Sequence, residues 1–383
     1  MKTIIIRQLV IIITLTVVGQ LTPLTLFAKQ ASFTSYNAGL ALGYVPLVGK
    51  RKTKIIETLK GHASDILCLQ EVYNPDVDDF IVALKDKYPY YYNISPKQIF
   101  TQKSPACGIS DLFGREKFIS CVISTCRSEK GSDFTKCVTT GCHESFEKLK
   151  NDNTDCAAAL IAQVGKGMVS SILTVLNPFD KAPLYPYDGS SGLLLLSKSP
   201  IKAKKSMEFK DSTSFYRTAL YAKLDIDGSD YHIACTHLTP NLEHTAPYTG
   251  HRKGWGEENA AQTVELIEFM NKEAKGEPQI LLGDFNHGVA DESTRLIGEL
   301  ADSYPIWSKS GYRDPAVEQK VGCSWCADNT LIEKEHDKKN TLIDHIFIKD
   351  THAKDIKSSV IFNALYDKAN LSDHFGLYLL LGM

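Results

Sequence analysis

Short apolar runs recur along the chain and predict buried β-strands. They are rich in branched side chains, and polar or turn residues bound each of them. The predicted strands are residues 31–36, 66–70, 192–197, 218–224, 231–236, 279–283, 341–348 and 376–381.

Helical patterns separate several of these strands. Residues 50–60 and 76–87 lie on either side of the strand at 66–70, and residues 257–275 carry apolar positions in a mixed face. Alternation of this kind predicts an α/β sandwich whose functional residues gather at strand ends. No internal repeat interrupts the pattern, so we expect one domain that carries an insertion.

The predicted insertion covers about residues 104–181, reads as helical and is rich in cysteine. Its cysteines are Cys107, Cys121, Cys126, Cys137, Cys142 and Cys156. Their positions are symmetric about one midpoint, so a hairpin folded there would give three nested disulfides. Six cysteines allow 15 connectivities, and the sequence does not select among them. A zinc site is the weaker alternative because short Cys/His pairs are absent.

Within the insertion, residues 157–179 contain a single charged residue, Lys166. This stretch could contact a lipid surface. An ordinary core helix is the favoured interpretation, because Gly165 and Gly167 break the amphipathic pattern of an interfacial helix.

The other cysteines lie outside the insertion. Cys68 and Cys235 sit within apolar strands, where buried free thiols are the favoured expectation. Cys323 and Cys326 flank a Ser-Trp pair, and we expect a local disulfide in a loop there, not a redox centre.

The composition indicates the class of protein, and the N-terminus indicates the compartment in which it is found. The chain has 383 residues, is 43% hydrophobic and 23% charged, and therefore resembles a folded globular protein. Residues 1–28 have the order of a secretory signal peptide, which predicts a mature chain of residues 29–383 and a secreted or extracytoplasmic location. An uncleaved anchor helix is the alternative. Ten cysteines suit an oxidising compartment.

Polar side chains follow several of the predicted strands. Asn37, Glu71 and His237 each come directly after an apolar run, and Asp284 and Asn286 follow the strand at 279–283. Carboxylate oxygens suit a hard cation such as Mg²⁺. Each motif alone is weak, since a single Glu, His or Asp is usually a cap, a turn residue or a solvated charge.

The ordered set of motifs is more specific than any one of them. QE, THL, GDFN, IDHIF and SDH each adjoin a strand, and the last two supply Asp344, Asp373 and His374. This set resembles the endonuclease/exonuclease/phosphatase superfamily over residues 32–103 and 184–383. The resemblance implies a four-layer α/β sandwich, in which two packed mixed sheets lie between helical layers, with the disulfide-rich helical insertion added.

The resemblance also implies a role for each motif residue at the metal and phosphate. Glu71 matches the direct metal ligand, with Asn37 beside the metal and Asp373 at a nearby acidic position. Asp284 and Asn286 match residues that position water and phosphate. The expected cofactor is Mg²⁺, for which Mn²⁺ or Ca²⁺ could substitute.

The remaining matches concern proton transfer. His374 matches the general base, Asp344 the carboxylate that orients it, and His237 a histidine that contacts the scissile phosphate or supports the leaving group. A histidine with a pKa near 6.5 can take a proton from water, and an adjacent carboxylate fixes its tautomer.

The substrate is the least constrained prediction. SYNAGL, LQEVY and GLLLLSKSPI resemble neutral sphingomyelinases, so we expect a sphingomyelin or phospholipid headgroup, with peripheral membrane contact through residues 157–179. The main alternative is a secreted endonuclease, for which a basic cluster could follow a nucleic-acid backbone, although a solvated strand edge is favoured there. That cluster is Lys198, Lys202, Lys204 and Lys205. A phosphoinositide phosphatase and a non-catalytic binding protein rank lower, and no obligate protein partner is expected.

Overall fold

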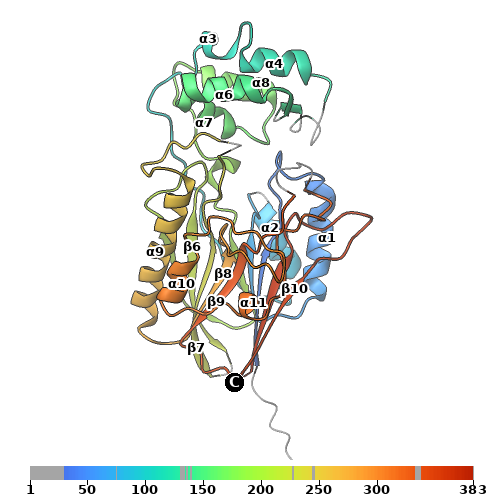
Figure 1. The fold of residues 1–383 in the computed structure, drawn as a ribbon, viewed down its shortest axis with the longest axis vertical. Helices are drawn as coiled ribbons and strands as arrows, with labels where there is room; N and C mark the ends of the chain where they lie inside the picture. The colour runs from blue at the N-terminus through green and yellow to red at the C-terminus, as the bar shows by residue number, and fades with distance from the viewer. Residues whose placement is uncertain are drawn as a thin grey trace, which may run out of the picture.

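Two β-sheets packed face to face form the centre of the molecule in this computed structural model (Figure 1). The structure describes residues 30–382 except 75, 130–133, 135, 136, 139, 227, 244, 245 and 333–337. Within these residues, one sheet has six strands in the order β10-β11-β1-β2-β4-β3, and the other has five in the order β5-β6-β7-β8-β9. The strands are β1 (Gln30–Asn37), β2 (Ile66–Gln70), β3 (Tyr90–Tyr92), β4 (Leu194–Ser197), β5 (Ile201–Glu208), β6 (Thr218–Ile226), β7 (Ser229–His237), β8 (Gln279–Asp284), β9 (Asp344–Lys349), β10 (Asp355–Ile361) and β11 (Gly376–Gly382).

Helices cover the outer face of each sheet, so the predicted four-layer α/β sandwich is confirmed (Figure 1). On the six-stranded sheet lie α1 (Val48–Gly61) and α2 (Asp76–Leu84). On the five-stranded sheet lie α9 (Trp255–Ala274) and α10 (Pro305–Lys309), and α11 (Pro315–Glu318) packs near β9 and β10.

Three apolar cores hold these layers together. Between the sheets, alternate strand residues such as Phe33 and Leu282 are fully buried. Phe80 of α2 packs on the six-stranded sheet, and Met270 of α9 packs on the five-stranded sheet. A fully buried side chain of this size contributes about 1.5–3 kcal/mol to the free energy of unfolding, so each interface is strongly favoured.

The strand directions bring the motif residues to one edge of the sandwich. β1 and β2 run parallel, as do β7 and β8, so each pair ends at the same edge. β9 and β11 run antiparallel to β8 and β1, so their first residues lie at that edge. Polar residues that are distant in sequence therefore converge without any special loop.

The insertion forms a separate helical layer at the top of the molecule in Figure 1. Its described helices are α3 (Ile109–Leu112), α4 (Phe118–Thr125), α6 (His143–Asp152), α7 (Thr154–Ile161) and α8 (Met168–Leu176). They surround an apolar core of their own.

A short antiparallel stem joins the insertion to the sandwich. The Thr101 amide donates to the Ala182 carbonyl at 2.9 Å, and the Leu184 amide donates to the Ile99 carbonyl at 2.9 Å. The Ala182 amide also donates to Thr101 Oγ1 at 3.1 Å. The entry and exit of the insertion therefore lie side by side.

The predicted nested disulfides of the insertion are present. They are Cys107–Cys156, Cys121–Cys142 and Cys126–Cys137. The inner pairs are possible because Cys126 caps the end of α4 and Cys142 caps the start of α6, so neither residue continues the helix beside it.

The other bridges give one confirmation and one correction. Cys323–Cys326 forms the expected local disulfide. The expectation of free thiols at Cys68 and Cys235 is wrong, because these residues join β2 of one sheet to β7 of the other, with 5.5 Å between their Cα atoms. Because 167 residues separate the two cysteines, no local spacing in the sequence indicates that they pair.

The apolar stretch at 157–179 is two helices and not a single core helix. Ala157 and Ala159 of α7 are fully buried, as the core interpretation predicted. On α8, Val169 and Leu173 are 67% and 65% exposed, and Phe179 beyond it is 90% exposed. The core expectation is therefore correct for α7 and for the side of α8 that carries Ile172 and Val175, and wrong for the side that carries Val169 and Leu173.

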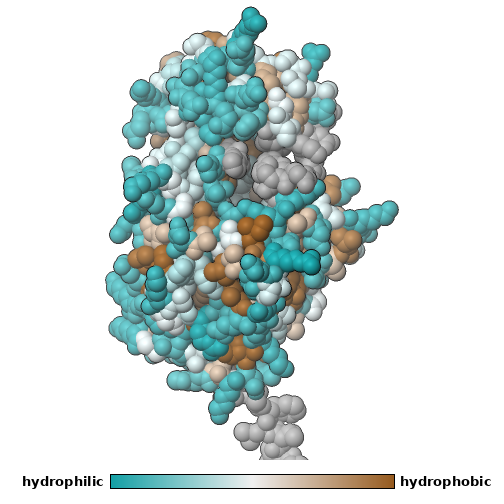
Figure 2. Space-filling model, viewed as in Figure 1, coloured by the Kyte–Doolittle hydropathy of each residue, from teal (hydrophilic) through white to brown (hydrophobic). Residues whose placement is uncertain are grey.

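Three strands were not predicted. β3 is short and consists of tyrosines, whereas β5 and β10 are edge strands with many exposed polar residues, so none shows a continuous apolar run. The predicted signal peptide lies outside the described residues. Among the described helices, none has the length and apolar character needed to cross a bilayer. The face of the sandwich in Figure 2 mixes apolar with hydrophilic residues, as protein surfaces generally do.

Candidate active site

Asp284 lies at the centre of the residues that converge at the sheet edge. Asn37 Nδ2 donates a 2.9 Å hydrogen bond to Asp284 Oδ2, and His237 Nε2 lies 3.3 Å from the same oxygen. His374 Nε2 lies 3.7 Å from it. These side chains come from β1, β7, β8 and the turn before β11, so the fold brings together residues up to 337 positions apart (374 − 37).

His374 and Asp344 form a buried pair. His374 Nδ1 lies 2.8 Å from Asp344 Oδ2, which leaves Nε2 directed towards Asp284. The ring of Trp325 packs edge-on against the imidazole of His374, with 5.0 Å between the ring centroids. Burial alone would lower the pKa of His374, but Asp344 and Asp284 outweigh burial and raise the pKa well above its ordinary value.

Glu71 occupies a strained position directly after β2. Its φ is +56°, in the left-handed region that an L-residue seldom adopts, so the surrounding structure must hold it there. Burial, together with the Asp373 and Asp284 carboxylates, raises the pKa of Glu71 to about 7. Neighbouring carboxylates that disfavour one another's charge are the donor set that a divalent cation would stabilise, so the residues present fit a hard metal ion.

Asp373 lies on the other side of this acidic group. Ser372 Oγ donates to Asp373 Oδ1 at 3.1 Å and also to the Asn37 carbonyl at 2.7 Å. Gly39 approaches Asp373 so closely that a Cβ there would lie 2.3 Å from Oδ1. A side chain at position 39 would therefore have to displace Asp373 or Ser372, so the loop after β1 is fitted to the acidic group.

Asn286 is fixed by two hydrogen bonds rather than left free. Its amide N–H donates to Asp284 Oδ1 at 2.9 Å, and its side-chain Nδ2 donates to the Leu238 carbonyl at 2.9 Å. Its φ of +55° turns the chain sharply after β8. Asn286 thus orients Asp284 and leaves its own side-chain oxygen available for a water or a substrate group.

Two further residues of the site were not predicted from the sequence. Arg217, just before β6, is 3% exposed, and its Nε has no hydrogen-bond partner among the described residues. Burial lowers the pKa of Arg217, and the nearby Tyr73, Glu71 and Asp284 oppose that shift. An arginine stays cationic in such a setting and is well suited to phosphate. The only sign in the sequence was that Arg217 directly adjoins a predicted strand, as the other motif residues do.

Arg51 of α1 is the second residue, and it positions the loops. Its guanidinium donates to the carbonyls of Pro46 at 2.8 Å, Ala38 at 3.2 Å and Leu371 at 2.9 Å, and also to that of Gly39. These carbonyls belong to the loop after β1 and the segment before His374. A single buried cation therefore ties together two segments that carry site residues.

Several buried polar atoms at the site lack partners among the described residues. They include His237 Nδ1 and Asp344 Oδ1. The pKa of His237 is well below its ordinary value because of burial, with Arg217 and His374 adding to the shift. His237 is therefore neutral, and it can contact a phosphate oxygen only through a ring nitrogen that carries hydrogen.

Two sets of residues could hold a cation. In the described part of the chain, one ligand atom each from Asp284, Asp344 and His374 lies within 4.8 Å of the others. The His374–Asp344 hydrogen bond, however, already uses two of these groups for each other. Glu71 with Asp373 forms the second set, since the Asp373 carboxylate contributes to the raised pKa of Glu71 and a cation held by both would remove that repulsion.

The lysine cluster is a solvated strand edge, as favoured from the sequence. β5 is an edge strand with its lysines exposed. Lys202 pairs with Asp225 and Asp230 at 3.0 and 2.6 Å. Lys198 pairs with Asp65, Lys205 with Glu273, and Lys204 donates to the Tyr91 carbonyl.

Comparison with known proteins gives the class. The model of the endonuclease/exonuclease/phosphatase family matches residues 34–374. The chain therefore belongs to this family, whose members are hydrolases that act on phosphodiesters and typically use divalent metal ions. No curated protein matched the sequence.

Three solved structures illustrate the similarity of the fold. SmcL aligns with a TM-score of 0.54 and 14% identity over 92% of this chain and 99% of that one. Sphingomyelinase C from Streptomyces griseocarneus aligns with a TM-score of 0.54 and 13% identity over 92% and 99%. Truncated Caenorhabditis elegans TDP2 aligns with a TM-score of 0.51 and 15% identity over 92% and 98%. At such low identity these similarities establish the fold alone.

Proposed function

We propose that this protein is a secreted, Mg²⁺-dependent phosphodiesterase that releases the headgroup of sphingomyelin or a related phospholipid. The observation that carries the proposal is the convergence of Glu71, Asp284 and the His374–Asp344 pair at one edge of the sandwich. A carboxylate-rich centre beside a carboxylate-oriented histidine is the arrangement that metal-assisted attack by water on a phosphodiester requires.

In this proposal each residue has one task. His374 Nε2 takes the proton of the attacking water, and Asp344 holds Nδ1 and stabilises the imidazolium that forms. Arg217 and His237 contact the phosphoryl oxygens, while Asn37 and Asn286 keep Asp284 oriented. Glu71 and Asp373 would hold the metal ion, which supplies positive charge to the phosphoryl group as negative charge develops there.

Two surface features favour a lipid over a nucleic acid. In the basic cluster, Lys198, Lys202 and Lys205 pair with carboxylates, so of these four lysines only Lys204 keeps an unneutralised charge that could follow a phosphate backbone. The insertion, in contrast, exposes Val169, Leu173 and Phe179 within a stretch of 11 residues, 169–179. Exposed apolar side chains on and beyond a short helix suit peripheral contact with a bilayer.

Secretion rests on the sequence of residues 1–28 and is supported by the cysteines. All ten are paired in five disulfides, and none is free. Disulfides that link both the two sheets and the insertion helices form in an oxidising compartment and are rare in the cytosol.

One parallel assay tests the proposal. Purified mature protein, with Mg²⁺ or with EDTA, is offered sphingomyelin vesicles, duplex DNA and a phosphoinositide. We expect phosphocholine release from the vesicles in the Mg²⁺ sample only, and release at least about a hundredfold slower from His374→Ala. Cleavage of DNA would replace the lipid proposal with the endonuclease alternative, and inactivity on all three substrates would favour a binding protein.

A further inference from the structure

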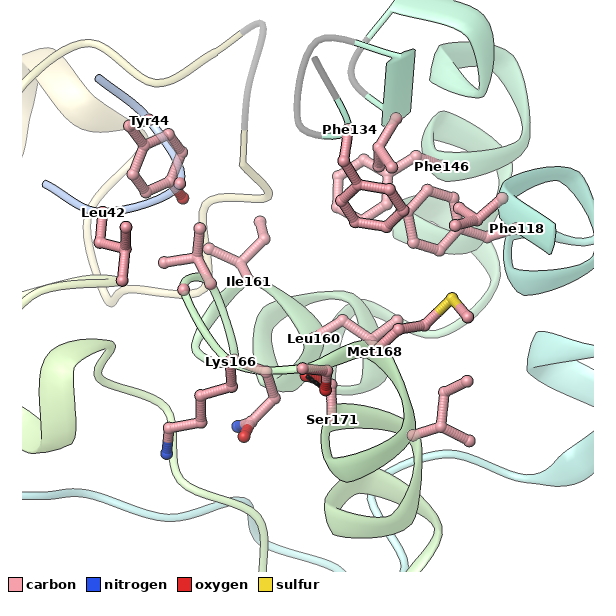
Figure 3. Close-up of a pocket in the computed structure, with 18 of the residues that line it drawn as sticks. Leu42, Tyr44, Phe118, Phe134, Phe146, Leu160, Ile161, Lys166, Met168 and Ser171 are labelled. Atoms are coloured by element: carbon pink, nitrogen blue, oxygen red, sulfur yellow. Dashed lines mark hydrogen bonds between the residues drawn. The ribbon is translucent and has the colours of Figure 1, made fainter. Parts of the chain in front are cut away.

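An apolar cavity of about 950 Å³ lies between the insertion and the loop after β1 (Figure 3). Leu42 and Tyr44 line it on the sandwich side. On the insertion side it is lined by Phe118, Phe146, Ile161 and Met168. The volume is at the upper end of the range of about 300–1,000 Å³ that small-molecule sites occupy, so the cavity can hold a sizeable apolar group.

Two glycines bring the walls of the cavity together. A Cβ at Gly43 would lie 2.8 Å from Val164 Cγ2, and a Cβ at Gly165 would lie 3.1 Å from the Leu42 carbonyl oxygen. Both glycines have positive φ, of +95° and +79°. The loop and the turn between α7 and α8 therefore approach at backbone distance, which joins the two parts of the molecule into one site. This close approach also explains why Gly165 interrupts the apolar stretch at 157–179.

Tyrosines connect the cavity to the metal-binding edge. Tyr44 lines the cavity, and the Glu71 carboxylate adds to the effect of desolvation in raising the pKa of its hydroxyl. Tyr187 donates to the Leu42 carbonyl at 3.1 Å, and its ring stacks on Tyr73 at 4.0 Å. These contacts lead from Leu42 of the cavity to Tyr73, which lies two residues after Glu71.

We propose that this cavity binds one hydrocarbon chain of the lipid whose phosphodiester lies at Glu71. The inference rests on the proposed function and extends it from the headgroup to the lipid tail. Of the lining residues only Lys166 and His143 can carry a charge, and Lys166 pairs with Asp188 at 3.0 Å. A peptide would bring polar backbone groups at every residue, more than the few polar side chains of this mainly apolar lining can satisfy, whereas a hydrocarbon chain brings none.

Neighbouring serines of α8 provide a matched test. Ser171 lines the cavity and Ser170 is exposed, yet both hydroxyls donate to the Gly167 carbonyl, at 3.0 and 2.8 Å. Ser171→Trp therefore fills the cavity, and Ser170→Trp places the same side chain outside it. Should Ser171→Trp fail to fold, as judged by thermal unfolding, Ile161→Trp fills the cavity from α7.

The first measurement is binding of monomeric dodecylphosphocholine, below its micelle concentration and in EDTA, by isothermal titration calorimetry. We expect wild type and Ser170→Trp to bind equally, and the cavity-filling variant at least about tenfold more weakly, which corresponds to about two methylene groups left unburied. Equal binding by all three, or no binding by wild type, would overturn the inference.

The second measurement separates this inference from the proposed function. Rates on monomeric short-chain and long-chain sphingomyelin analogues give a chain-length preference for each protein. The inference predicts a long-chain preference that the cavity-filling variant loses and Ser170→Trp keeps. Lipid hydrolysis with an unchanged preference would overturn the cavity alone. Detergent binding that depends on the cavity, without lipid hydrolysis, would overturn the proposed function and leave an apolar-chain site.

Discussion

His374 Nδ1 and Asp344 Oδ2 lie 2.8 Å apart at the buried edge of the sandwich, and this pair determines which ring nitrogen faces the acidic centre. Because Nδ1 is held by the carboxylate, Nε2 is directed to Asp284 at 3.7 Å. The pair fixes the orientation and the tautomer of a group that would otherwise rotate.

Replacement of either member should lower turnover without unfolding the protein. For His374→Ala we expect kcat to fall by about 10²–10⁴, the usual value of general-base assistance. Asp344→Asn should lower kcat by a similar factor. It should also move the acidic limb of the pH profile to lower pH, because Asp344 raises the pKa of His374. Near-normal turnover in His374→Ala would remove His374 from catalysis.

Binding of a divalent ion should release a proton when the pH is below about 7. Burial and the Asp373 carboxylate raise the pKa of Glu71 to about 7, so the metal must displace a proton there under mildly acidic conditions. Affinity for Mg²⁺ should therefore fall as the pH decreases through 7. Calorimetry in buffers of different ionisation enthalpy measures the proton release, and Glu71→Gln should abolish it. An unchanged Mg²⁺ titration in that variant would exclude Glu71 as a ligand.

His62 should make the fold less stable in acid. Burial lowers its pKa to about 4, with Lys87 and Lys198 adding to the shift, whereas the unfolded chain titrates near 6.5. Between these values the unfolded chain binds a proton that the folded protein does not. Stability is therefore complete above about pH 6.5 and falls as the pH decreases towards 4.

The measurement is the free energy of unfolding in urea at several pH values, for wild type and His62→Gln. We expect the wild-type curve to fall more steeply between pH 6.5 and 4 than the curve of the variant. Parallel curves would contradict the assignment to His62.

Removal of Arg51 should destabilise the protein by about 3–5 kcal/mol. Its guanidinium is 4% exposed and satisfies four backbone carbonyls, so Arg51→Ala leaves buried acceptors unpaired. Arg51→Lys keeps the charge but loses the planar guanidinium. Its free energy of unfolding should lie between those of wild type and Arg51→Ala. Chemical denaturation checks this order. A loss below about 1 kcal/mol in Arg51→Ala would show that water replaces the guanidinium.

The disulfide between the sheets should contribute about 2–5 kcal/mol, since it closes a loop of 167 residues. The double variant Cys68→Ala/Cys235→Ala should unfold at a correspondingly lower urea concentration. Cys323→Ala/Cys326→Ala provides the control, because that bridge spans only 3 residues and constrains the unfolded chain little. Equal losses in the two double variants would argue against the chain-entropy explanation.

Much of the site could be predicted because its residues are attached to strands. Asn37, Glu71, His237 and Asp284 each end an apolar run, and strands of one direction end at one edge. Arg217 was not predicted because the sequence does not distinguish a buried arginine from an exposed one. Its burial depends on neighbours brought together by the tertiary fold.

The same reason explains the errors outside the site. The symmetric local spacing of the insertion cysteines suggested nested pairs, without selecting among the possible connectivities. No such spacing relates Cys68 to Cys235, since their proximity depends on how the two sheets pack. The exposed side of α8 was missed because apolar residues predict burial, whereas the fold places Val169 and Leu173 on the outside.

The stem at residues 99–101 and 182–184 has a consequence for how this protein is built. Because the two chain segments are hydrogen-bonded to each other where they leave the sandwich, a turn of a few residues could join Thr101 directly to Ala182. The helical layer could therefore be removed without breaking any strand of the sandwich, but the cavity that it forms with the loop after β1 would be lost with it.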